Sequence, residues 1–240
     1  MRVRKKNWAE GELAVNTLIL DVDSPYSKRW HEYFGNLNPI YVEIGSGKCG
    51  FITQMAQKFP DINFIAFERE QMVIVNGARK IRELNENGEN IKNIVFICAD
   101  AMCLRAIFEK HEISRLFLNF SDPWPRRKKW AKRRLTHRNF LNVYQELLVE
   151  FGEIHMKTDN TVLFEFSLNE FSQTGWGLKN ITLDLHNSPF AKDNIMTEYE
   201  TKFSERGMPI YRLEAEFPNK NAVKAYESYV EKEADEIMNE

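Results

Sequence analysis

A glycine-rich stretch with a carboxylate beside it is the part of the sequence best suited to chemistry. The segment "VEIGSGKCG" carries Gly45-x-Gly47-x-x-Gly50 directly after an apolar run, and Glu43 stands two residues before the first glycine. Glycines at this spacing permit a tight turn and let a ligand approach the backbone at a helix N-terminus. The pattern predicts a nucleoside-cofactor site, with an ordinary tight turn as the alternative.

Two further acids help to choose between possible cofactors. Glu68 ends the next apolar run, where a carboxylate can accept hydrogen bonds from ribose hydroxyls, and Asp100 follows the third run, beside the expected place of an adenine ring. The carboxylate of Glu43 suits a cationic ligand part better than a pyrophosphate. These residues favour S-adenosylmethionine over a dinucleotide.

A fourth acid comes directly before a block of positive charge. Asp122 lies in "NFSDPWPRRKKWAKRRL", where Ser-Asp-Pro is also ordinary turn chemistry. Trp124 offers a flat face on which a base could stack. The cations that could contact a tRNA backbone are Arg127, Lys128, Lys129, Lys132, Arg133 and Arg134. Because the whole chain has a net charge of −2, this local block indicates an anionic partner such as nucleic acid, although a solvated charged face is the alternative.

Short apolar runs that alternate with amphipathic stretches would position these residues. The expected strands cover residues 40–45, 63–68, 93–99, 115–120, 153–158, 180–185 and 210–217. A helix is expected within 136–149, with Gly152 as a stop signal. The alternation predicts an α/β fold with a mostly parallel seven-stranded sheet, helices on both faces and an antiparallel edge strand. Parallel strands bring the acids to one edge of that sheet.

Composition predicts one cytoplasmic domain. We expect a domain over 1–218, with a basic N-terminal arm over 1–39 and an acidic helical extension over 219–240. The three cysteines lack metal-type spacing and indicate reduced thiols, so no metal site is expected. No apolar run reaches the length of a membrane span, and the first residues lack the apolar core of a signal peptide.

The chain resembles the bacterial tRNA (guanine-N7)-methyltransferases over roughly residues 2–217. The resemblance rests on "VEIGSGKCGFI", "NFSDPWPRRKKWAKRRLT", "HMKTDNTVLFEFSL", "LHNS" and "NIMTEYETKFSERGMPIYR". It implies a Rossmann-like fold, S-adenosylmethionine as methyl donor, and methylation of guanosine 46 in the variable loop of tRNA. We expect no obligatory protein partner, and the sequence leaves open whether the protein is a monomer or a homodimer.

The resemblance also implies roles for single residues. The family's donor-binding acids fall on Glu43, Glu68 and Asp100, and its catalytic aspartate, which borders the donor, falls on Asp122. Its substrate-binding positions fall on Arg126, Asp159, Thr197, Glu198, Tyr199 and Glu200. The family usually has lysine where this chain has Arg126, and the two side chains differ in geometry. Asp159 and Glu200 are candidates to accept hydrogen bonds from the Watson–Crick edge of guanine.

Three other functions are compatible with parts of the pattern. A nicotinamide oxidoreductase would use the glycine loop but leaves the basic block unexplained. An amino-methyltransferase acting on adenine or cytosine has a similar loop to Ser121-Asp122-Pro123-Trp124, usually with two consecutive prolines. A non-catalytic RNA-binding protein would bind tRNA without methyl transfer.

Overall fold

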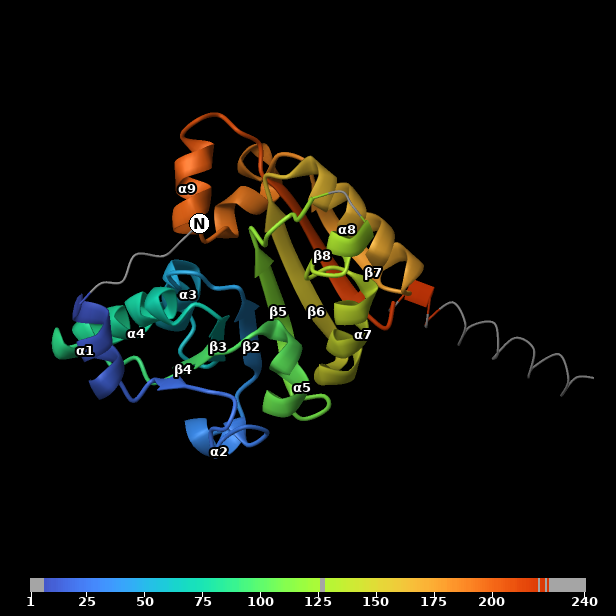
Figure 1. Cartoon of the computed structure of the whole chain (residues 1–240). Coiled ribbons are helices and arrows are strands. Elements are labelled where there is room, and N and C mark those ends of the chain that lie inside the picture. The colour runs from blue at the N-terminus through green and yellow to red at the C-terminus, as the bar shows by residue number, and fades with distance from the viewer. Residues whose placement is uncertain (1–6, 126–127, 220, 223, 225–240) are drawn as a thin grey trace, which may run out of the picture.

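The protein is built around one eight-stranded sheet. The structure, a computed structural model, describes residues 7–125, 128–219, 221–222 and 224. The strands follow the order β1-β4-β3-β2-β5-β6-β8-β7 across the sheet (Figure 1). Their bounds are β1 Ile19–Leu20, β2 Ile40–Ile44, β3 Asn63–Glu68, β4 Ile94–Cys98, β5 Ile113–Asn119, β6 Leu148–Thr158, β7 Gly177–Thr182 and β8 Tyr211–Phe217.

The direction of the strands confirms the expected mostly parallel sheet with an antiparallel edge. Strands β1 to β6 pair in parallel, whereas β8 pairs antiparallel with both β6 and β7. The sheet has one strand more than expected because the two-residue β1 joins its outer edge beside β4. A strand of two residues is too short to give a periodic signal in the sequence.

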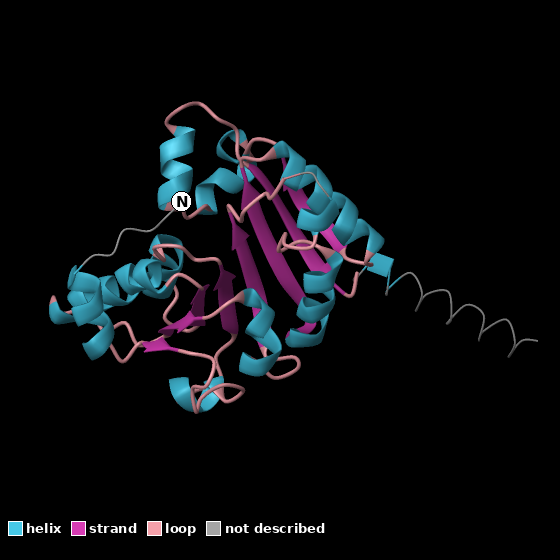
Figure 2. Cartoon of the chain, in the orientation of Figure 1, coloured by secondary structure: helices cyan, strands magenta, loops and turns pink. Residues whose placement is uncertain are grey.

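Helices cover both faces of the sheet (Figure 2). Helices α3 (Gly50–Lys58) and α4 (Gln71–Glu86) pack on one face of the central strands, and α5 (Leu104–Ile107), α7 (Arg138–Leu147) and α8 (Thr161–Gln173) pack on the other. Alternate residues of β3 enter the two cores, so that Phe64 joins the first and Ile65 the second. Apolar side chains on both faces explain the continuous apolar runs in the sequence.

The segment around Gly152 differs from its prediction. Helix α7 ends at Leu147, the chain passes directly into β6, and Gly152 lies inside that strand. A Cβ added to Gly152 would come within 2.9 Å of the Cβ of Leu148 and of the carbonyl oxygen of Val149. The glycine therefore permits a close approach of backbone within the strand and does not stop the helix.

The region expected to be an N-terminal arm is partly built into the domain. Helix α1 (Asn7–Val15) is fastened to α4 by an ion pair between Glu12 and Arg82, 2.8 Å apart. Trp30, in α2 (Trp30–Phe34), is fully buried and donates to the carbonyl of Ile107. Residues 1–6 lie outside the described residues, as does almost all of the expected extension over 219–240.

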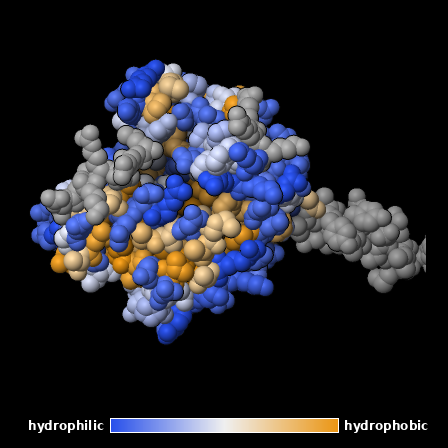
Figure 3. All heavy atoms as spheres, viewed as in Figure 1, coloured by the Kyte–Doolittle hydropathy of each residue, from blue (hydrophilic) through white to orange (hydrophobic). Residues whose placement is uncertain are grey.

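The exposed surface carries mostly hydrophilic side chains. Figure 3 shows them over most of the visible face, with apolar residues in a band across its middle. Within the described part of the chain, no helix has both the length and the apolarity needed to cross a membrane.

Candidate active site at the carboxyl edge of the sheet

The glycine loop joins β2 to α3 through left-handed backbone. Gly45 has φ +76° and Gly47 has φ +55°, a region that residues with a Cβ rarely adopt. The amides of Gly45 and Ser46 both donate to the carbonyl oxygen of Phe67, at 2.7 and 3.0 Å. These two bonds bring the end of β2 against the end of β3, so the loop lies close to Glu68.

Glu68 and Asp100 each hold the backbone of a neighbouring loop. The carboxylate of Glu68 accepts from the amides of Gly47 and Glu70, both at 3.0 Å. Asp100 caps the short 3-10 helix η1 (Ala101–Cys103) by accepting from the amide of Met102 at 2.9 Å. Both acids stand at strand ends, as predicted, and both line one cavity.

This cavity has a volume of about 680 Å³, which is in the usual range for a small-molecule site. Its wall combines residues that are distant in sequence. It is lined by Ile44, Gly45, Phe67, Glu68, Arg69, Glu70, Val73, Ala99, Asp100, Ala101, Met102, Phe120, Ser121, Asp122, Trp124, Lys132, Arg133, Leu135 and Phe140. The structure therefore brings Gly45, Glu68, Asp100 and Asp122 together around one space.

Glu43 is not among the residues that line this cavity. Its side chain is buried, and one carboxyl oxygen accepts from Nδ2 of Asn119 at 2.8 Å, whereas the other has no hydrogen-bond partner among the described residues. Burial raises the pKa of Glu43 to about 8, against the opposing effects of the Asn119 bond and the charge of Lys157. A cation placed nearby would favour ionisation of this carboxyl group.

The loop that carries Asp122 leaves the end of β5 with two left-handed residues, Phe120 at φ +51° and Trp124 at φ +44°. The guanidinium of Arg134 donates to the carbonyl oxygens of Pro123 and Trp124, at 2.7 and 3.1 Å. These bonds hold the loop so that exposed Asp122 stands on the cavity wall.

The basic block does not act as a uniform surface. Arg134 is 4% exposed, so the structure places it inside the loop and not where a tRNA phosphate could reach it. Lys129, Lys132 and Arg133 are exposed, as expected for phosphate contacts. Arg126 and Arg127 lie outside the described residues, as does the side chain of Lys128.

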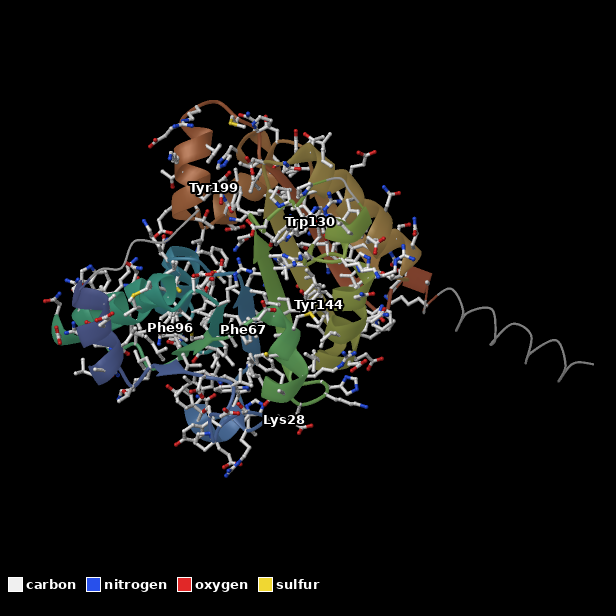
Figure 4. The ribbon with its side chains drawn as sticks, in the orientation of Figure 1. Lys28, Phe67, Phe96, Trp130, Tyr144 and Tyr199 are labelled. Atoms are coloured by element: carbon white, nitrogen blue, oxygen red, sulfur yellow. The ribbon has the colours of Figure 1, made fainter. Side chains whose placement is uncertain are left out.

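Two indole rings accompany these cations. Trp124 and Trp130 stack with centroids 5.4 Å apart and planes inclined by 8°, and the guanidinium of Arg133 lies within 5 Å of both rings. Trp130 comes from α6 (Lys128–Ala131). In Figure 4, Trp130 and Tyr199 both lie near the end of the arrow of β5, where the parallel strands finish. Flat rings among cations suit an RNA partner.

The segment expected to bind substrate forms the start of α9 (Glu198–Ser204). Thr197 caps this helix and Glu200 completes a capping box, so both side chains are engaged within the segment. Tyr199 is 44% exposed and its hydroxyl lies 3.4 Å from Oδ2 of Asp159. Its ring also packs against Phe120 of the cavity wall, with centroids 5.0 Å apart. Tyr199 thus contacts both Asp159 and Phe120, although neither Asp159 nor Tyr199 lines the cavity itself.

Glu200 is placed differently from Asp159. It is fully buried, and its carboxylate accepts from Nζ of Lys157 at 2.6 Å and from Nδ2 of Asn194 at 2.6 Å. In this arrangement it does not face a base. Lys157 and Asn119 were not predicted as site residues, since a single lysine or asparagine at a strand end gives no signal until its neighbours in space are known.

A second cavity, of about 440 Å³, lies over the same sheet beside α3. Its floor includes Glu153, His155 and Glu214, whose side-chain ligand atoms lie within 4.8 Å of one another, a geometry that could hold a metal ion. Both acids are already engaged, because Arg115 bonds Glu153 at 2.5 Å and Arg212 bonds Glu214. These ion pairs favour a structural cluster over a metal centre.

The order of the strands and the helices on both faces form a Rossmann-like fold, which solved methyltransferases share. Among solved structures, the 16S rRNA methyltransferase KamB superposes with a TM-score of 0.60 over 78% of this chain and 91% of that one, at 10% identity. An antibiotic-related methyltransferase superposes with a TM-score of 0.57 over 78% and 90% of the two chains, at 16% identity. At these identities the likeness establishes the fold.

Sequence comparison identifies the family. A family described as "Putative methyltransferase" matches residues 37–213. The chain is 50% identical to the tRNA (guanine-N(7)-)-methyltransferase of Staphylococcus haemolyticus, over 90% of this chain and 98% of that one. It is 49% identical to the enzyme of the same name from Brevibacillus brevis, over 89% and 98% of the two chains. The chain therefore belongs to the tRNA (guanine-N7)-methyltransferase family.

Proposed function

We propose that this protein transfers the methyl group of S-adenosylmethionine to N7 of guanosine 46 in the variable loop of tRNA. The observation that carries the proposal is the shared cavity, in which two acids suited to a nucleoside face Asp122 and a wall of basic and aromatic side chains. Its relatives named as tRNA (guanine-N7)-methyltransferases, and one solved structure of the same fold described with cosubstrate SAM, support the reaction and the donor.

The donor, when bound, supplies an electrophilic methyl carbon on a sulfonium. In our proposal Gly45 and Gly47 allow the donor to approach the backbone of the loop. Glu68 accepts hydrogen bonds from the ribose hydroxyls, and Asp100 lies beside the adenine ring. Glu43 acts from below the loop as a buried carboxyl group whose ionisation responds to a nearby cation. The substrate-contacting set would be Arg126, Asp159 and Tyr199, with Thr197, Glu198 and Glu200 shaping the segment that presents them.

Guanine N7 carries a free lone pair at neutral pH, so its methylation needs no strong general base. The chain must chiefly align N7 with the methyl carbon, which can contribute up to roughly 7–11 kcal/mol in favourable cases. Positive charge moves onto the purine during transfer. The carboxylate of Asp122, fixed on the cavity wall, would stabilise that charge.

We propose a cytoplasmic enzyme with one methyltransferase domain over 1–218 and an extension over 219–240, acting on tRNA as a monomer or homodimer. It would use no metal and need no other protein.

The test uses purified protein, labelled S-adenosylmethionine and unmodified tRNA with guanosine or 7-deazaguanosine at variable-loop position 46. We expect label in the first tRNA and none in the second. Equal labelling of both would exclude N7 as acceptor and favour an amino-methyltransferase. Tight tRNA binding without labelling of either would favour an RNA-binding module.

A further inference from the structure

Buried and partly buried polar side chains lie between the glycine loop and the segment that precedes α9. Glu43, Asn119 and Lys157 lie on the same face of three adjacent strands, and Asn119 pairs with Lys157 in the register of β5 and β6. Asn119 bonds Glu43, and Lys157 bonds Glu200, each through side-chain atoms. The two bonded pairs therefore lie side by side at the carboxyl edge of the sheet, and the second pair reaches the capping box of α9.

Lys157 is the centre of this arrangement. Lys157 is only 6% exposed. Its Nζ donates to Oε2 of Glu200 at 2.6 Å, to Oδ1 of Asn194 at 3.0 Å and to the carbonyl oxygen of Ile195 at 2.9 Å. The same ammonium lies 5.1 Å from the ring centroid of Phe51, the second residue of α3. One buried cation therefore fastens the 194–200 segment to the sheet beside the start of α3.

This attachment brings Glu198 against the glycine loop. A Cβ built on Gly50 would come within 2.5 Å of Cδ and Oε1 of Glu198 and 2.6 Å of its Oε2, so the carboxylate packs directly on the backbone where α3 begins. The unpartnered oxygen of buried Glu43 lies in the same region, and the charge of Glu198 raises the pKa of Glu43. A helix expected to contact tRNA thus supplies a negative charge at the loop expected to hold the donor.

We propose that Lys157 is a positioning residue that holds Glu198 over the glycine loop, and that it thereby couples binding of the cationic donor to binding of tRNA. The proposal rests on the proposed function. Loss of the methyl group converts a sulfonium into a neutral thioether, because sulfur keeps the bonding electron pair. Acids around the loop therefore favour the donor over its demethylated product, and Glu198 adds to that preference when α9 is in place.

Because tRNA binding and donor binding would both favour the same placement of α9, each should strengthen the other by the same factor. The test measures this factor by calorimetry. Two unreactive ligands are used, with and without saturating tRNA. Sinefungin carries an ammonium group at the place of the sulfonium methyl, whereas S-adenosylhomocysteine has a neutral thioether there. For the unaltered protein we expect tRNA to strengthen sinefungin binding by roughly fivefold and S-adenosylhomocysteine binding by less.

Glu198→Gln keeps size and shape and removes the charge at an exposed position. We expect it to weaken sinefungin binding severalfold, to leave S-adenosylhomocysteine binding unchanged and to reduce the coupling factor. Lys157→Met should give the same loss, and Lys157→Arg, which keeps the cation, should recover part of it. Glu165→Gln, an exposed change on α8, is the matched control.

The outcomes separate this proposal from the proposed function. An unaltered ratio of the two affinities in Glu198→Gln, in protein that still methylates tRNA, would overturn the coupling and leave the function standing. Unaltered protein that binds neither ligand would overturn both. If Lys157→Met fails to fold, Glu198→Gln and Lys157→Arg still decide the question.

Discussion

At the scale of single residues, Asp122 on the cavity wall and Glu43 below the glycine loop have different environments. Asp122 is exposed on the cavity wall, where a base could reach it, whereas Glu43 is buried and one of its carboxyl oxygens has no hydrogen-bond partner among the described residues. Sequence spacing treats them alike, because both follow or end a strand. The two carboxyl groups differ because Glu43 is buried beneath the glycine loop and Asp122 is not, so a different effect is expected when each is replaced.

Asp122→Asn should lower kcat with little change in either binding constant, because the amide keeps the shape but not the charge that opposes the developing positive purine. Once bound tRNA covers Asp122, the loss of this one electrostatic contact would lower the rate by about 10²–10³. Single-turnover transfer of label, together with separate donor and tRNA titrations, measures this. Full turnover in the variant would remove the electrostatic role of Asp122.

Glu43 should make the protein less stable as pH rises from about 5 to 8. Its pKa is raised to about 8 by burial, so the folded state holds a proton that the unfolded state releases at lower pH. The contribution of Glu43 to the free energy of unfolding is fully present below the pKa that Glu43 has in the unfolded state. It is lost as pH rises from there to about 8, by at most about 5 kcal/mol.

Glu43→Gln should therefore gain stability relative to the unaltered protein as pH increases, by more than about 1 kcal/mol between pH 5.5 and 8. The amide oxygen of glutamine can still accept from Asn119. Urea unfolding at several pH values gives the measurement. A difference between the two proteins that stays constant with pH would contradict the raised pKa.

At the scale of elements, loops at the carboxyl edge are fixed by side chains that come from elsewhere in the chain. Arg134 holds the Pro123–Trp124 turn, and Lys157 holds the segment before α9. Both were hidden in the sequence, one as a member of a basic run and the other as one lysine in a strand. Whether a cation faces solvent or a carbonyl depends on tertiary packing.

Arg134→Met should destabilise the protein by about 1–3 kcal/mol, because two carbonyl groups of the turn lose a buried charged donor. Donor binding should weaken as well, since Asp122 and Trp124 line the cavity. Thermal unfolding and donor titration measure both effects. Lys129→Met, at an exposed neighbour, is the control and should weaken tRNA binding alone. Equal stability of the two variants would show that Arg134 does not hold the turn.

At the scale of the whole molecule, the parallel sheet and its ligand edge were predictable, whereas the detailed joining of the parts was not. The pattern of glycines and acids after apolar runs predicted that Gly45, Gly47, Glu68 and Asp100 lie at the carboxyl ends of strands. Continuous apolar strands indicated a sheet covered on both faces. The position of β8 between β6 and β7 was not predictable, because pairing order depends on long-range contacts that leave no local pattern.

The molecule as a whole carries a net charge of only −2, so we expect its affinity for tRNA to depend on the local basic block. The logarithm of the tRNA binding constant should fall linearly with the logarithm of salt concentration, by about 0.7–0.9 per phosphate contact. Lys129→Gln with Lys132→Gln should reduce that slope by roughly 1.5. Fluorescence titration between low and physiological salt measures it. An unchanged slope would place the phosphate contacts elsewhere on the surface.

The stacked pair of Trp124 and Trp130 gives the protein an optical reporter at the wall where we propose that RNA binds. Trp30 and Trp176 are almost completely shielded from solvent, whereas the stacked pair is partly accessible and surrounded by cations. Iodide, an anionic quencher, should concentrate around this pair more than neutral acrylamide does. Trp8, which is also partly accessible and lies 5.0 Å from the guanidinium of Arg79, would first be changed to phenylalanine. In that variant bound RNA would displace the iodide, so the difference between the two quenchers would report occupancy of the stacked pair without any label.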